Sequence, residues 1–137
     1  MNNVITVEQT ISMGHRLPSY DGICSSPHGH NVRFVVSVRT EGFFDFKHLS
    51  GDLLRVIADF DHAMVLAGSD PIVQFLEGMS FRLVLLNVEP STEAIAQVVF
   101  NELSRNTGYE VLTVVVHETA KYSATASSRY GPVQRIR

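Results

Sequence analysis

The chain has 137 residues, a formal net charge of −3 and 45 % hydrophobic residues, which suits one globular domain spanning residues 1–137. The 11 Lys and Arg residues are scattered, so no nucleic-acid interface is expected. No apolar stretch approaches the roughly 20 residues that span a bilayer, and the first ten residues lack the basic and apolar regions of a signal peptide. The single cysteine excludes an internal disulfide and fits a reducing compartment, so we expect a cytoplasmic protein.

Two segments with alternating polarity come first. Apolar residues occupy odd positions over residues 4–17 and even positions over residues 30–38. A period of two is typical of a half-buried strand. The Pro-, Ser- and Gly-containing residues 18–27 between them predict a loop, so we expect an antiparallel hairpin.

Helical spacing begins after the second strand. Asp45 is placed to cap a helix that runs to about Phe60. The later segments predict, in chain order, a short helix from Asp70, a strand at 81–88, a helix capped near Ser91, a strand at 111–119 and a short strand near 130–136. We therefore expect an α+β fold in the order ββααββ, with two main helices on one face of an antiparallel sheet.

Three of the six histidines continue the apolar faces of the first two strands. His15 shares the odd phase of the first strand, and His28 and His30 share the even phase of the second. If the strands pair, the three imidazoles converge on one side of the sheet. Three imidazoles with an open fourth position are typical of a catalytic zinc site, although imidazole also suits iron, nickel and copper. The alternative is three separate core or loop histidines.

The motifs of the chain resemble those of the 6-pyruvoyltetrahydropterin synthase and 6-carboxytetrahydropterin synthase family. The matching segments are His15-Arg16-Leu17, Cys24-Ser25-Ser26-Pro27-His28-Gly29-His30, Asp45-Phe46, Asp61-His62, Pro90-Ser91-Thr92-Glu93 and Glu118-Thr119. They follow one another in the family's order through nearly the whole chain. The combination is specific, although a lone Asp-His or Glu-Thr pair would mean nothing.

The resemblance implies a role for each matching side chain. His15, His28 and His30 would hold Zn²⁺, and Cys24 would be an acid/base residue, although its position alone also allows a fourth metal ligand or an inert thiol. His62 would relay protons with Asp61 as its orienting partner, and the pair would act with a cysteine from a neighbouring subunit. Glu118 and Thr119 would anchor a pterin. Four cations are candidates for binding a triphosphate: Arg16, Arg33, Lys121 and Arg129. No role is expected for His48.

The spacing Cys-x-x-x-His-x-His resembles the 6-carboxy branch of the family, which serves queuosine and 7-deazaguanine synthesis. That branch converts 7,8-dihydroneopterin triphosphate to 6-carboxytetrahydropterin, with loss of acetaldehyde and triphosphate. The alternatives are a 6-pyruvoyltetrahydropterin synthase, a non-catalytic zinc- or pterin-binding relative, and a small metal-dependent hydrolase.

The resemblance also implies an architecture and an assembly. The tunnelling fold (T-fold) of this family is a four-stranded antiparallel sheet with two helices on one face. We expect a homo-hexamer, a dimer of trimers, with active sites between subunits.

Overall fold

A long antiparallel hairpin is the centre of the fold. The computed structural model describes residues 1–137. Strands β1 (Asn2–His15) and β2 (His28–Glu41) pair without interruption, from Asn2 opposite Glu41 to His15 opposite His28. The predicted hairpin is thus confirmed, and both strands end within a few residues of the positions expected from the alternation. The loop that joins them carries one 3₁₀ turn, Ile23–Ser25.

The sheet has six strands rather than the four that were expected. The additional elements are β3 (Met64–Ala67), β4 (Leu83–Leu86), β5 (Glu110–His117) and β6 (Ser123–Ala126), and the strand order is β4-β3-β1-β2-β5-β6. Strand β3 lies parallel to β1 and to β4, so the sheet is mixed and not purely antiparallel. The strand predicted near 130–136 is wrong, because this segment makes only an isolated bridge between Arg135 and Leu86.

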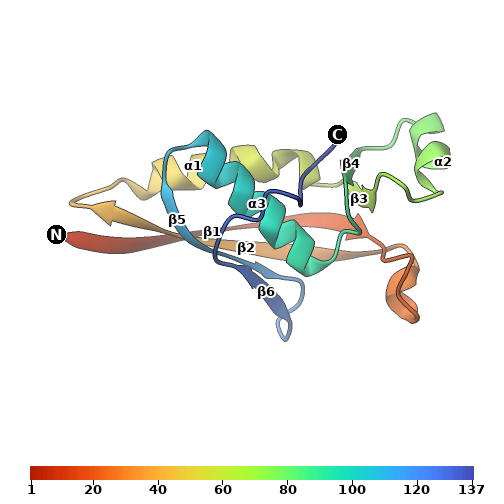
Figure 1. Ribbon diagram of the computed structural model, residues 1–137, viewed down its shortest axis with the longest axis horizontal. Coiled ribbons are helices and arrows are strands. Elements are labelled where there is room, and N and C mark those ends of the chain that lie inside the picture. The colour runs from red at the N-terminus through yellow and green to blue at the C-terminus, as the bar shows by residue number, and fades with distance from the viewer.

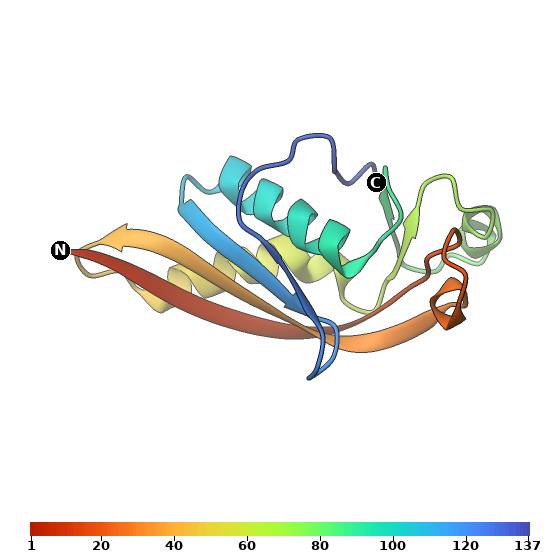
Figure 2. The same ribbon diagram turned by 60° about the horizontal axis from the view of Figure 1, so that its bottom comes forward.

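Both long helices cover one face of the sheet, as predicted (Figures 1 and 2). Helix α1 (Phe46–Ile57) begins at Asp45, whose carboxylate accepts a hydrogen bond from the Lys47 amide. Helix α3 (Thr92–Asn106) begins at Ser91, whose hydroxyl accepts from the Ala94 amide. A third, short helix, α2 (Val73–Gly78), lies at the end of the molecule near β3 and β4. None of the helices is both long enough and apolar enough to cross a membrane.

The core lies between this sheet face and the two long helices. It contains inward-facing side chains of β1, β2 and β5 and the buried stripes of α1 and α3. Among the largest fully buried side chains are Phe34, Phe60, Leu49, Leu53 and Leu103. The histidines that were predicted to share this inward phase stand at the end of the hairpin next to the loop, where the apolar core gives way to polar groups.

Candidate metal and pterin site

The hairpin register brings His15, His28 and His30 together. His15 lies directly opposite His28, and Met13 lies opposite His30. The centres of the three imidazole rings lie 4.5 to 5.4 Å apart. Positions i and i+2 of one strand share a face, and the register places the third ring on the same face of the neighbouring strand.

Hydrogen bonds fix the tautomers of two of these rings. The Nδ1 of His15 lies 2.8 Å from the carbonyl oxygen of Pro90, and the Nδ1 of His28 lies 2.7 Å from that of Ser26. A carbonyl oxygen only accepts, so each Nδ1 carries a hydrogen and donates it. The Nε2 atom of a neutral ring is then left with a free lone pair, which is the form of imidazole that binds metals.

A carboxylate completes this group. One nitrogen from each ring and one carboxylate oxygen of Glu118 all lie within 4.8 Å of one another. The Glu118 Oε1 atom lies 3.1 Å from the Nε2 atoms of both His15 and His30. Neither contact has hydrogen-bond geometry, so both Nε2 atoms are buried without a hydrogen-bond partner.

Two unpaired nitrogen atoms beside a carboxylate are a poor arrangement without a cation. Buried polar atoms normally have partners, and each orphan carries a desolvation cost. A divalent cation bound by the imidazoles would use both lone pairs and offset the negative charge. The site also adjoins a cavity of about 10 Å³, lined in part by His15, His30 and Glu118. The donor set and the space therefore fit a Zn²⁺ ion.

Burial favours the metal-binding form of His15. Desolvation lowers the pKa of this imidazole, and the neighbouring His28 and His30 lower it further, against opposing effects of the Pro90 carbonyl and Glu118. A neutral ring is the state in which histidine binds a metal.

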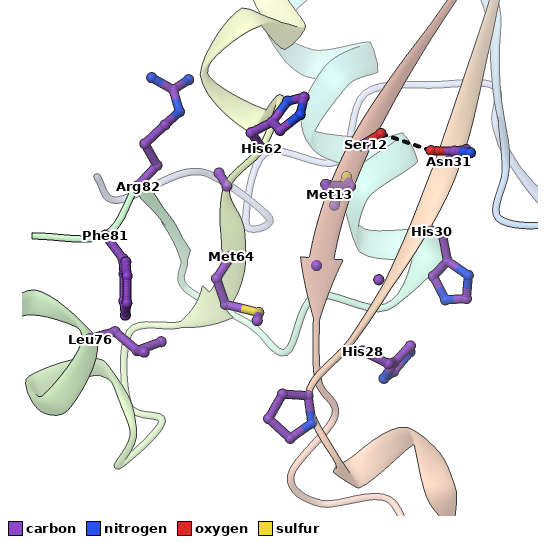
Figure 3. Close-up of a pocket in the computed structure, with 14 residues that line it drawn as sticks. Ser12, Met13, His28, His30, Asn31, His62, Met64, Leu76, Phe81 and Arg82 are labelled. Carbon is purple, nitrogen blue, oxygen red and sulfur yellow. Dashed lines mark hydrogen bonds between the residues drawn. The ribbon is translucent and has the colours of Figure 1, made fainter. Parts of the chain in front are cut away.

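A second, open cavity of about 750 Å³ lies beside this end of the hairpin. Figure 3 shows His28 and His30 on one side of it and Leu76, Phe81 and Arg82 on the other. This volume is in the range of small-molecule sites. The floor between the two sides includes the facing pair Gly14 and Gly29, which have no side chains to fill it.

His62 lies at this open cavity, and Asp61 orients it. The Asp61 carboxylate lies 2.9 Å from His62 Nδ1 and also accepts a hydrogen bond from the Ser12 amide. This backbone bond is the largest influence that lowers the pKa of Asp61, with His62 adding to it. His62 has a φ of +59°, a left-handed conformation that is uncommon for a residue other than glycine. The side chain of His62 is 77 % exposed.

Other predicted residues lie apart from the histidines. Cys24 is half-buried in the 3₁₀ turn Ile23–Ser25 and lines neither cavity. Thr119 is exposed, and its hydroxyl accepts hydrogen bonds from the amides of Lys121 and Tyr122, so it caps a turn between β5 and β6. The fold of the chain therefore does not bring Cys24 and Thr119 into the cluster of possible metal ligands.

Two of the four cations predicted to bind a triphosphate are already paired with carboxylates of the protein. Arg16 is bound by Asp70, and Arg33 lies 2.9 Å from Glu8. Lys121 and Arg129 are exposed and form no ion pair. Arg82, which was not predicted from the sequence, lines the open cavity next to His62. The signal was weak, because this arginine belongs to no motif and directly precedes a short strand. His48, for which no role was expected, is exposed on α1.

Comparisons with known proteins agree with this architecture. The family model described as 6-pyruvoyl tetrahydropterin synthase matches residues 4–129. A protein of Halobacterium salinarum named probable 6-carboxy-5,6,7,8-tetrahydropterin synthase is 37 % identical over 99 residues, which cover 68 % of this chain and 64 % of that relative.

Solved structures show the same fold at low sequence identity. An uncharacterized protein from Wolinella succinogenes superposes with a TM-score of 0.76 at 19 % identity, covering 94 % of this chain and 99 % of the other. The 6-pyruvoyl tetrahydropterin synthase of Plasmodium falciparum gives 0.73 at 21 % identity with the same coverage. That of Caenorhabditis elegans gives 0.69 at 21 %, covering 93 % and 96 %. The fold is the T-fold of these proteins, and the chain belongs to the 6-pyruvoyl tetrahydropterin synthase family.

Proposed function

We propose that this protein converts 7,8-dihydroneopterin triphosphate to 6-carboxy-5,6,7,8-tetrahydropterin, with loss of acetaldehyde and triphosphate, as a zinc-dependent lyase of queuosine or 7-deazaguanine synthesis. The observation that carries the proposal is the convergence of three imidazoles and Glu118 beside an open cavity, in a chain of this family. The name of the Halobacterium relative and the spacing of Cys24 before His28 favour the 6-carboxy product.

His15, His28 and His30 would hold the zinc ion. A bound Zn²⁺ supplies Lewis acidity, which stabilises negative charge on substrate oxygen atoms. The protein's own contribution is orientation. The Pro90 and Ser26 carbonyls hold the His15 and His28 rings in the tautomer that leaves Nε2 free.

Cys24 and His62 would carry the protons of the reaction. With Nδ1 directed to Asp61, the Nε2 atom of His62 is free to accept or donate a proton at the open cavity. Cys24 lines neither cavity of its own protomer. The proposal therefore pairs His62 with the cysteine of a neighbouring subunit.

Glu118 would bind the pterin ring. Its carboxylate can accept two hydrogen bonds from the guanidine-like N–H edge of a pterin. Its position 3.1 Å from two imidazole nitrogens keeps it at the metal cluster, so pterin binding requires the side chain to turn away from them. Thr119 would contribute through the turn that it caps next to Glu118.

Free strand edges support an assembly of several copies. Strand β1 pairs with β3 only at Gly14 and His15, so its outer edge is open over most of its length, and β6 is the other edge of the sheet. Unpaired edges invite pairing with another chain. Joining β6 of one copy to β1 of the next is a head-to-tail contact, which forms a ring when the rotation between copies closes. We propose a homo-hexamer made of two such rings. The single cysteine of each chain fits a reducing compartment such as the cytoplasm.

The test is product identification. Zinc-loaded protein is incubated with 7,8-dihydroneopterin triphosphate, and the products are analysed by mass spectrometry beside Cys24→Ala. Ser26→Ala is the matched control. Ser26 lies in the same loop as Cys24, and its exposed hydroxyl makes no hydrogen bond. We expect 6-carboxytetrahydropterin and acetaldehyde from the wild type and Ser26→Ala but not from Cys24→Ala. A 6-pyruvoyl product would keep the site and change the reaction. Zinc binding without turnover would reject the proposal.

A further inference from the structure

A buried ion pair joins the residue after His15 to the segment before α2. The Asp70 side chain is fully buried, with an exposed fraction of 0 %. Arg16 donates to both of its oxygens, from Nε at 2.7 Å and from Nη2 at 2.8 Å. This is the two-pronged geometry in which a guanidinium binds a carboxylate most specifically. Arg16 is the only cation paired with this buried charge.

The same guanidinium also reaches the cysteine loop. Its Nη1 donates to the Ser25 carbonyl at 3.3 Å, and the neighbouring Leu17 amide donates to the Cys24 carbonyl at 2.8 Å. The two residues that follow His15 therefore hold both carbonyls of the Cys24–Ser25 segment. Asp70 in turn accepts a hydrogen bond from the Ile72 amide, so the buried carboxylate is itself fixed by backbone.

We propose that Arg16 and Asp70 are positioning residues that fix the Cys24 turn relative to the metal-binding histidines. The inference rests on the proposed proton-transfer role of Cys24. It also reassigns Arg16, which the sequence offered as a triphosphate-binding cation. With its donors directed to Asp70 and Ser25, this guanidinium is committed to protein groups.

Two kinds of variant separate positioning from folding. Arg16→Lys keeps the positive charge but loses the fork that reaches Asp70 and Ser25 together. The double variant Arg16→Met with Asp70→Leu removes the buried carboxylate together with its partly buried partner, which often preserves stability, and it also removes the bond to Ser25. Arg39→Lys is the matched control, because Arg39 forms an exposed pair with Glu110 far along the same hairpin.

The readouts follow the thiol and the reaction independently, on zinc-loaded protein. Cys24 is the only cysteine, so alkylation by iodoacetamide measured by intact mass reports on this residue alone. We expect both Arg16 variants to alkylate several-fold faster than the wild type at unchanged zinc content. We also expect kcat to fall roughly tenfold to a hundredfold with little change in KM, as for a misplaced catalytic group. Arg39→Lys should match the wild type in both assays.

Each other result has a defined meaning. A raised KM with unchanged kcat and unchanged alkylation would show that Arg16 binds the triphosphate, which overturns the inference. Wild-type alkylation and turnover in the double variant would overturn it as well. If the wild type does not turn over dihydroneopterin triphosphate, the proposed function fails. The alkylation rates then still decide whether the ion pair holds the Cys24 turn.

Discussion

Zinc should stabilise the protein strongly. His30→Met should separate the two sources of that stability: relief of the buried, unpaired Nε2 atoms, and the bonds between zinc and its imidazole ligands. The Nε2 atoms of His15 and His30 are buried without hydrogen-bond partners. An unsatisfied buried polar atom costs about 1 to 3 kcal/mol, so metal-free protein carries about 2 to 6 kcal/mol that metal binding relieves. At about 4 °C per kcal/mol for a domain of this size, zinc should raise Tm by roughly 8 to 24 °C.

The substitution should have opposite signs with and without metal. In zinc-free protein, His30→Met replaces an orphaned nitrogen with an apolar side chain and should raise the free energy of unfolding by about 1 kcal/mol or more. With saturating zinc the variant should be less stable than the wild type, because one of three imidazole ligands is gone. His48→Met is the matched control, since His48 is exposed on α1 and should change stability by less than about 0.5 kcal/mol in either state.

The assay is urea unfolding of chelator-treated and zinc-loaded protein, with metal content measured in parallel. A zinc-free His30→Met protein that is less stable than the wild type would refute the cost assigned to the orphaned nitrogens. An equal zinc-induced shift in wild type and variant would refute His30 as a ligand.

Three further predictions concern groups around the site and core. Burial is the largest single influence and would raise the pKa of Asp70, but the hydrogen bonds from Arg16 and the Ile72 amide, with the positive charge of Arg16, together outweigh it and hold the pKa below its ordinary value of 3.8. The stability that this carboxylate contributes is present above about pH 4 and is lost as pH falls through the lowered pKa, so Asp70→Asn should flatten the acid limb of unfolding free energy against pH. An unchanged acid limb would contradict this. His62→Asn should lower kcat by roughly a hundredfold or more while changing urea stability by less than about 0.5 kcal/mol, because asparagine, like histidine, tolerates the positive φ at this position. Ser80→Asn, at the same φ of 59°, is the control and should keep full turnover. Burial, and then a hydrogen bond to a carboxylate, raise the pKa of Tyr109 to about 12. Ultraviolet titration should therefore show a late tyrosinate step near pH 12 that Tyr109→Phe lacks; its presence in the variant would assign it elsewhere.

Local signals in the sequence predicted the elements that hold the metal-ligand candidates. Strict alternation predicted β1 and β2, and the shared phase of His15, His28 and His30 predicted their convergence, because register follows from which face is buried. Side-chain caps at Asp45 and Ser91 marked the beginnings of α1 and α3.

The sequence was weakest where pairing is non-local. Strand β3 has four residues and no alternation of polar and apolar side chains. It pairs in parallel with β1, which is distant in sequence, so no hairpin turn marks the pairing. Strand β6 consists of Ser123–Ala126, four small residues of which only Thr125 favours strands. A strand was predicted near 130–136, but there the Ile136 amide donates to the Leu85 carbonyl without forming a ladder. The Arg16–Asp70 pair spans 54 residues, so neither member identifies the other in the sequence.

The unbroken register of the hairpin determines where the chain can gain or lose residues without separating the three imidazoles. Adding or deleting one residue inside β1 or β2 would turn every side chain beyond it to the opposite face and separate the imidazoles. Residues 16–22 lie outside the ladder, so extra residues there would leave His15 and His28 paired. Changes between Cys24 and His28 would also keep that pair but would move the thiol. The histidine cluster is thus insensitive to loop length, whereas the placement of the Cys24 thiol depends on it, so the loop can vary without separating the three imidazoles.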